Sequence, residues 1–449
     1  MQPTEKTTAE KPAAATRKLR IFGCLLAAFV VATLTYFIAA RFRFVDYQVY
    51  YYAGLSLLAG RTDLYSSTFS LGELLDYRYP PLFLLLIWPL SLLSFSAATY
   101  VWWLLCWAQE FGCIYYVRRL VRENGRAGMS LFCWVIVSLA VAPYYVMALQ
   151  YGNAQIFVTM AIFGSFCLAL RSKVIQAALL MALAITFKVF VLLAIPYFIL
   201  KKQWNYLAAV GLFVVILNLL PAFYFGFGKN LELVGTWFDH IVLDHERHET
   251  IGPINLSLKG QLRRHLTDID YSERVSGTDW ADTEYRQVNL VSIPSQYAAY
   301  IWIGLSLILY LVFAVVVWRN RAAPASGQRR LLEYGLIVCL TLLVNPLSYK
   351  IYFILLLLPL AALANFAFTA GSTQAKVSRY VVYFVAAANV ILPLIPGRIA
   401  QRLLLVIGTD FWITTVVTAT LFYVLASATL TDDLDVEASS DLDAGYSTA

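Results

Sequence analysis

The chain has 449 residues, of which 60% are hydrophobic and only 14% are charged. Soluble proteins are about 45–50% apolar and about 25% charged. A soluble core of this size could not bury so much apolar surface. The composition therefore argues against a soluble enzyme, a secreted domain and a nucleic-acid-binding protein, and the mean hydropathy of +0.67 indicates a polytopic membrane protein. The formal net charge of +7 comes mostly from short basic clusters between apolar runs, which is typical of membrane-protein loops.

Polar segments are found at both ends of the chain. Residues 1–20 are polar and basic at their end, and we expect a disordered cytoplasmic tail. Residues 431–449 contain six Asp and Glu residues with Ser and Gly, which predicts a disordered acidic tail. The apolar run 21–40 is longer than the core of a signal peptide, about 7–15 residues, so an uncleaved first helix is expected. The predicted membrane domain is 21–430.

Thirteen apolar segments lie between the tails, mostly about 15–22 residues long, as a helix needs to cross the bilayer. They are 21–40, 81–95, 97–117, 130–148, 153–170, 174–187, 189–200, 204–225, 296–317, 332–346, 351–369, 380–395 and 403–427. A β-barrel would instead show alternating segments of about ten residues. The predicted fold class is an all-α polytopic membrane protein.

Basic clusters set the expected orientation. Those at 171–173, 201–202, 319–330 and 376–379 are predicted to be cytoplasmic. With both tails inside, the number of crossings is even, so one of the thirteen segments should not cross. Segment 81–95 is short and interrupted by proline, which favours a half-helix lining a protein cavity. We expect about twelve transmembrane helices, within a range of about 11–13.

Two polar loops, 41–80 and 226–295, then fall on the extracytoplasmic side, and we expect short amphipathic helices in them. Segments 174–187 and 189–200 are predicted to form a hairpin with Lys188 at its outward tip. A lysine inside a membrane protein is costly, so its presence there indicates a functional site.

Asp46, in the first outer loop, is the candidate catalytic residue. On a helix, Tyr50 and Ala53 would share its face at i+4 and i+7. An Asp before a helix is typical of an N-cap. It also suits a general base, provided that partial burial raises its pKa towards neutrality. The sequence leaves both interpretations open.

Several short motifs follow Asp46 along the chain. They are Gly60–Tyr65 (GRTDLY), Tyr77–Pro81 (YRYPP), Tyr151–Gln155 (YGNAQ), Phe187-Lys188, Asn255–Lys259 (NLSLK), Arg263-Arg264 and Asn345–Tyr352 (NPLSYKIY). Together they resemble glycosyltransferase family 87, of the GT-C fold, over roughly residues 40–370. The family includes a mycobacterial mannosyltransferase activity that depends on polyprenyl-phosphomannose. Ile351 stands where the family usually has His, and Lys350 would point about 100° away from it on a helix.

The resemblance implies an inverting transfer of a hexose, with mannose expected, from a polyprenyl-phosphate donor to an extracytoplasmic lipid or glycan acceptor. Asp46 would be the general base. The implied donor-phosphate and substrate-binding residues are Lys188, Lys350, Arg263, Arg264, Tyr79, Arg78, Asn153, Gln155, Asn255 and Ser257. Arg263 and Arg264 are expected in a water-exposed loop, where a plain solvated face is equally compatible with the sequence.

The histidines of the second outer loop include His245 and His248, at the i, i+3 spacing that suits one face of a zinc-binding helix. No HExxH motif is present, and the resemblance implies neither metal nor cofactor. Residues 229–249 are instead predicted to form an amphipathic helix on the membrane surface, anchored by Trp237 and Phe238.

Two other functions stay open at this point. One is a transporter or flippase for a lipid-linked substrate, and the other is a non-catalytic relative that takes part in envelope assembly. A transporter would show matching halves with broken helices, and none stands out. The candidate residues fall on one predicted side, which favours a transferase in the cell membrane with an extracytoplasmic site and no nucleic-acid partner.

Overall fold

The computed structural model describes residues 28–37, 44–66, 69, 76–125, 128–243, 254–268, 288–319 and 327–427. Within these ranges the regular structure is helical and contains no strand, so the all-α prediction is confirmed. The predicted tails, 1–20 and 431–449, lie outside the described residues.

Helices of very different lengths follow one another along the described chain. They are α2 (Val45–Leu58), α3 (Pro81–Ile87), α4 (Phe95–Asn124), α5 (Leu131–Tyr151), α6 (Gln155–Leu170), α7 (Val174–Phe187), α8 (Ile195–Leu200), α9 (Trp204–Leu219), α10 (Ala222–Phe225), α11 (Phe227–Trp237), α13 (Leu258–Leu266), α15 (Ser295–Arg319), α16 (Gly327–Val344), α17 (Leu357–Thr369), α18 (Thr373–Ile391), α19 (Arg398–Ile407) and α20 (Thr409–Ala426). Shorter helical pieces are η2 (Trp88–Leu92), η3 (Val189–Ala194), η4 (Phe238–Val242), η6 (Lys350–Leu356) and η7 (Leu392–Leu394).

Six helical stretches in the described part of the chain are long and apolar enough to cross a membrane. They are Leu131–Tyr151, Trp204–Phe225, Ser295–Arg319, Lys350–Thr369, Thr373–Leu394 and Leu403–Ala426. Shorter apolar helices accompany them at Ala28–Phe37, Pro81–Leu92, Gln155–Leu170, Val174–Phe187 and Val189–Leu200. The chain is therefore a multi-pass membrane protein, and the number of crossings stays a prediction.

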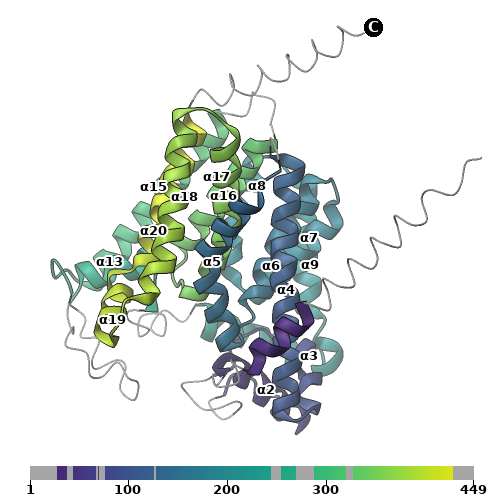
Figure 1. The fold of residues 1–449 in the computed structure, drawn as a ribbon. Coiled ribbons are helices and arrows are strands. Elements are labelled where there is room, and N and C mark those ends of the chain that lie inside the picture. Colours follow the sequence, from purple (N-terminus) through teal and green to yellow (C-terminus); the bar gives the residue numbers. More distant parts are fainter. Residues whose placement is uncertain are drawn as a thin grey trace, which may run out of the picture.

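The helices pack as two groups that share one core. Helices α4, α6, α7 and α9 lie side by side, and α5, α16, α17, α18 and α20 form the second group (Figure 1). Helices α16 and α17 join the groups through contacts with α4. The most apolar 18 residues of the stretch Lys350–Thr369 are 94% buried, which is typical of a helix surrounded by other helices.

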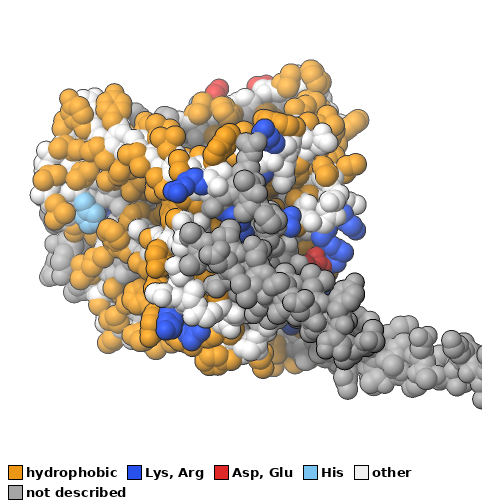
Figure 2. Space-filling view, turned by 90° about the horizontal axis from the view of Figure 1, so that it is seen from above, with side chains coloured by type: hydrophobic (Ala, Val, Ile, Leu, Met, Phe, Trp, Pro, Cys, Tyr) orange, Lys and Arg blue, Asp and Glu red, His pale blue; other side chains and the backbone are white. Residues whose placement is uncertain are grey.

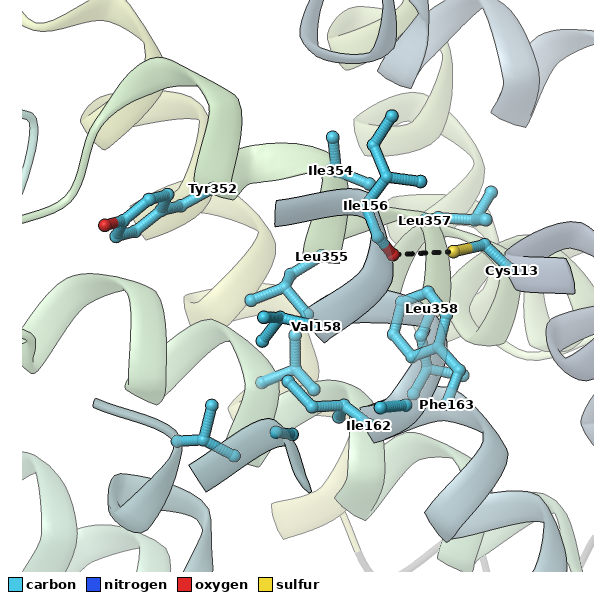
Figure 3. Packing of buried hydrophobic residues seen from close by; sticks show 14 of the residues in the cluster. Cys113, Ile156, Val158, Ile162, Phe163, Tyr352, Ile354, Leu355, Leu357 and Leu358 are labelled. Carbon is cyan, nitrogen blue, oxygen red and sulfur yellow. Dashed lines mark hydrogen bonds between the residues drawn. The ribbon is translucent and has the colours of Figure 1, made fainter. Parts of the chain in front are cut away.

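The segment η6–α17 packs directly against α6. Figure 3 shows Leu355 next to Val158, while the ring of Tyr352 points away from the other labelled side chains. In the same cluster the Sγ of Cys113 on α4 lies 3.7 Å from the carbonyl oxygen of Ile156. Apolar packing thus holds η6 in place, and the Tyr352 hydroxyl points out of the apolar cluster.

One end of the bundle is built from short elements. Helix α2 packs against α3 and η2, and these lie together at the lower end of Figure 1. Pro81 begins α3 and Pro89 lies in η2, so the two pieces are a proline-broken pair, as expected for 81–95. At about 1.5 and 2.0 Å per residue they extend about 20 Å, less than the bilayer core of about 30 Å.

The opposite end of the bundle carries ion pairs, some within one helix and some between neighbouring segments. They are Arg119–Glu123 at 2.8 Å, Arg171–Glu123 at 3.5 Å, Lys201–Glu333 at 2.7 Å and Arg329–Glu333 at 3.4 Å. Figure 2 views this end and shows Lys and Arg side chains scattered among hydrophobic ones. Arg171, Lys201 and Arg329, which belong to three of the basic clusters, therefore form ion pairs at this end, away from α2 and α3.

Candidate active site

Asp46 lies in the first turn of α2. The helix is capped at Phe44, which has a left-handed backbone (φ 45°) and makes no side-chain cap, so the N-cap interpretation of Asp46 is wrong. A non-glycine residue with this backbone is uncommon. The carboxylate of Asp46 instead accepts a hydrogen bond from Nδ2 of Asn153, with 2.6 Å between the heavy atoms. Tyr50, one turn further along α2, is buried and close enough to interact with the Asp46 carboxylate, which agrees with the predicted shared face.

The turn between α5 and α6 orients Asn153. Gly152 ends α5 in the left-handed region (φ 65°), and its carbonyl accepts a hydrogen bond from Nε1 of Trp102 at 2.9 Å. The side-chain oxygen of Asn153 accepts from the backbone N–H of Gln155 at 2.7 Å. Because that oxygen is engaged, the amide NH₂ is the group that faces Asp46. The Gln155 side chain is fully buried and reaches Thr159, at 3.4 Å.

Lys188 lies in an extended break between α7 and η3. Its Nζ donates to the hydroxyl of Tyr352 at 3.0 Å. The same ammonium lies 4.6 Å from the ring centroid of Tyr352 and 5.3 Å from that of Tyr79. Aromatic faces attract a cation at such distances, so the ammonium is held in place without a carboxylate partner among these contacts.

Arg78 and Tyr79 precede α3 and complete the cluster. The hydroxyl of Tyr79 accepts a hydrogen bond from that of Tyr50 at 2.9 Å. The Arg78 carbonyl accepts from Nε1 of Trp237 at 3.2 Å. The Arg78 guanidinium lies close enough to interact electrostatically with the carboxylate of Asp46 and with the hydroxyl of Tyr349.

Burial and the neighbouring positive charges have opposite effects on the pKa of Asp46. Burial raises the pKa of its carboxyl group, and this is the largest effect. The hydrogen bond from Asn153 and the charges of Lys188 and Arg78 act in the opposite direction. A carboxylate with a raised pKa is a stronger base, which is the property that proton abstraction from a hydroxyl requires.

Lys350 faces a different partner. It begins η6, and its Nζ lies 3.7 Å from the carboxylate of Asp410 in the first turn of α20. Asp410 is buried, and its carboxylate also interacts with the hydroxyl of Tyr144 on α5. Asp410 was not predicted from the sequence, because its proximity to Lys350 arises only when α20 packs against η6.

Asn255 and Ser257 fix a loop rather than line the Asp46 cluster. Nδ2 of Asn255 donates to the carbonyl of Pro346 at 2.9 Å, and its Oδ1 accepts from the N–H of Ser348 at 3.1 Å. The Ser257 hydroxyl caps α13 by accepting from the N–H of Gly260 at 3.2 Å. These bonds hold α13 against the segment that leads into η6.

Arg263 and Arg264 lie on α13 and are both buried, so the expectation of a water-exposed loop is wrong. Nη2 of Arg264 donates to the carbonyl of Asn255 at 2.9 Å. Trp237 also differs from its prediction as a surface anchor, because its side chain is buried against the Arg78 backbone. The helix predicted over 229–249 is observed as α11 and η4 as far as Val242.

The site thus assembles Asp46, Asn153, Arg78, Tyr79 and Lys188 from four separate segments. Tyr349 and Tyr352 were not predicted as site residues, although both lie in the motif NPLSYKIY. Their spacing of three residues at the start of η6 was the available signal. His245 and His248 lie outside the described residues.

Comparison with known proteins identifies the class of this protein. The model described as Glycosyltransferase family 87 matches residues 77–346, more than half of the chain. The protein is a membrane glycosyltransferase. It belongs to glycosyltransferase family 87, as the motifs indicated.

Two known proteins are also similar to this chain. One is the polyprenol-phosphate-mannose-dependent α-(1-2)-phosphatidylinositol pentamannoside mannosyltransferase of Mycolicibacterium smegmatis, 24% identical over 357 residues, which cover 78% of this chain and 76% of the relative. The other is the crystal structure of ArnT from Cupriavidus metallidurans bound to undecaprenyl phosphate, with 13% sequence identity and a TM-score of 0.37. That alignment covers 90% of this chain and 78% of ArnT.

Proposed function

We propose that this protein transfers a hexose, with mannose as the first candidate, from a polyprenyl-phosphate donor to an extracytoplasmic lipid or glycan acceptor, with inversion at the anomeric carbon. The observation that carries the proposal is the carboxylate of Asp46, held by Asn153 beside the charges of Lys188 and Arg78. The polyprenol-phosphate-mannose dependence of the mycobacterial relative supports the donor class.

The reaction follows from this charge arrangement. The acceptor hydroxyl attacks the anomeric carbon while the bond from that carbon to the phosphate oxygen breaks. Asp46 takes the hydroxyl proton and becomes a neutral carboxylic acid. The polyprenyl phosphate leaves with the bonding electron pair, and Lys188 and Arg78 stabilise its growing negative charge. The proposal assigns no metal or cofactor to these steps.

The position of the site supports an extracytoplasmic reaction. Asp46, Arg78 and Tyr79 belong to the end built from α2 and α3, whereas the ion-paired basic residues lie at the opposite end. Basic loops are typically cytoplasmic. On this orientation the donor sugar and the acceptor meet at the outer surface.

The test is sugar transfer in membranes from cells that make this chain, supplied with radiolabelled polyprenyl-phosphomannose. Asp46→Asn keeps the shape of the side chain and removes the base, and we expect transfer to fall at least about 100-fold. Glu232→Gln, on the exposed surface of α11, is the matched control and should retain transfer. Equal transfer by wild type and Asp46→Asn would remove Asp46 as the base.

A further inference from the structure

An apolar cavity of about 400 Å³ lies where α9, α10 and α11 meet. Its lining is entirely hydrophobic and consists of Ile216, Leu219, Leu220, Ala222, Phe223 and Phe227. Phe223 is 94% exposed and Phe227 is 64% exposed. Aromatic side chains this exposed mark a surface that meets lipid or an apolar ligand.

The cavity is joined to the Asp46 cluster through α9. Asn218 lies between the lining residues Ile216 and Leu219, and its Nδ2 lies 3.5 Å from the hydroxyl of Thr186. Thr186 is two residues before Lys188 at the end of α7. One turn of α9 therefore presents an apolar face to the cavity and a polar contact to the segment that holds the ammonium.

Helix α11 makes a second connection between the cavity and the cluster. It begins at Phe227 in the cavity wall and ends at Trp237, whose Nε1 donates to the Arg78 carbonyl. Near its start, Asn230 donates to the carbonyl of Asn218 at 2.9 Å. Ten residues of helix rise about 15 Å, so the cavity and the Arg78 backbone are separated by about the length of this one helix.

We propose that this cavity binds the isoprenoid chain of the donor, in the part that follows the phosphate. The inference rests on the proposed function and adds to it the place where the lipid docks. A lipid phosphate has an anionic head and a long hydrocarbon chain. It needs a cationic site and an apolar surface open to the bilayer, and α9 and α11 connect the two. The length of the isoprenoid chain would then contribute to the affinity of the protein for its donor, independently of the sugar.

Binding of two polyprenyl phosphates to the purified full-length protein in detergent tests the proposal. The probes are a radiolabelled fifty-carbon polyprenyl phosphate and ten-carbon citronellyl phosphate. We expect the wild type to bind the long chain at least about tenfold more tightly. Ala222→Phe and Leu219→Trp fill the cavity, and each should weaken long-chain binding about tenfold while leaving short-chain binding within about twofold. Leu307→Trp, at a 60% exposed position on α15, is the matched control.

The outcomes separate this inference from the function on which it rests. Equal affinity for the two chain lengths, or unchanged binding by both filled variants, would overturn the cavity as the lipid site and leave the transferase standing. Failure of the wild type to bind either probe would overturn the donor class and both proposals with it. Competition by phosphatidylglycerol as effective as that of the long-chain probe would reassign the cavity to ordinary acyl chains.

Discussion

At the scale of single residues, the contact between Asp46 and Asn153 matters most. These residues are 107 positions apart in the chain, and 2.6 Å separates the two atoms of their hydrogen bond. Burial makes the carboxyl group harder to ionise, and Asn153 partly offsets that effect. The asparagine therefore sets both the direction of the carboxylate and the pH range in which it accepts a proton.

Replacing Asn153 with Ala should shift the pH dependence of transfer. The raised pKa of Asp46 means that activity falls as pH falls through that pKa, because only the carboxylate is a base. Asn153→Ala removes a hydrogen bond that lowers the pKa, so the acidic limb should move to higher pH. The pH profile of kcat/KM measures this. A limb that stays in place, or moves to lower pH, would contradict the role of Asn153.

Variants of Lys188 and Tyr352 distinguish the contribution of the lysine charge from that of the hydrogen bond between the two side chains. Lys188→Met removes the cation and should lower transfer at least about 100-fold, because the leaving phosphate loses one of its two proposed cationic partners. Tyr352→Phe keeps the ring beside the ammonium and removes only the hydroxyl, so its loss should be about tenfold or less. Steady-state kinetics of both variants measure the difference. A larger loss in Tyr352→Phe would assign the hydroxyl itself to the reaction.

At the scale of elements, proline and lysine made two breaks predictable. Pro81 and Pro89 indicated the short pair α3–η2, and Lys188 marked the extended joint between α7 and η3. The ion pair between Lys350 and Asp410 was not predictable, because it depends on how α20 crosses η6. The position of a break in a helix can be predicted from the local sequence. The side-chain partners on distant helices depend on packing and cannot be predicted in this way.

The carboxylate of Glu333 should contribute more to stability than that of Asp410. Glu333 is buried with Lys201 and Arg329, and the Arg329 side chain is only 4% exposed. Glu333→Gln leaves two cations without this neutralising charge and should cost about 3–5 kcal/mol. Asp410→Asn should cost less, because Lys350 is 32% exposed and can reach water. Thermal unfolding in detergent compares the two variants, and equal losses would contradict this ranking.

At the scale of the whole molecule, composition and the lengths of the apolar segments were enough to predict an all-α membrane protein. They could not fix the number of crossings, because several apolar helices are shorter than a full span. The full set of site residues could not be predicted either, because part of it depends on how the helices pack. Asp46, Asn153 and Lys188 were each recognised, but the aromatic residues Tyr349 and Tyr352 join them only after η6 packs against α6.

The orientation of the bundle has a direct test in cysteine accessibility. The native residues Cys106, Cys113, Cys133, Cys167 and Cys339 are all buried, so background labelling from these five should be low. Glu232→Cys lies on α11 near the site end, and Lys202→Cys lies at the opposite end, beside α9. If Asp46 works at the outer surface, an impermeant maleimide should label Glu232→Cys in intact cells and Lys202→Cys only after permeabilisation. The reverse pattern would place Asp46 on the cytoplasmic side, where the acceptor would have to be a cytoplasmic molecule.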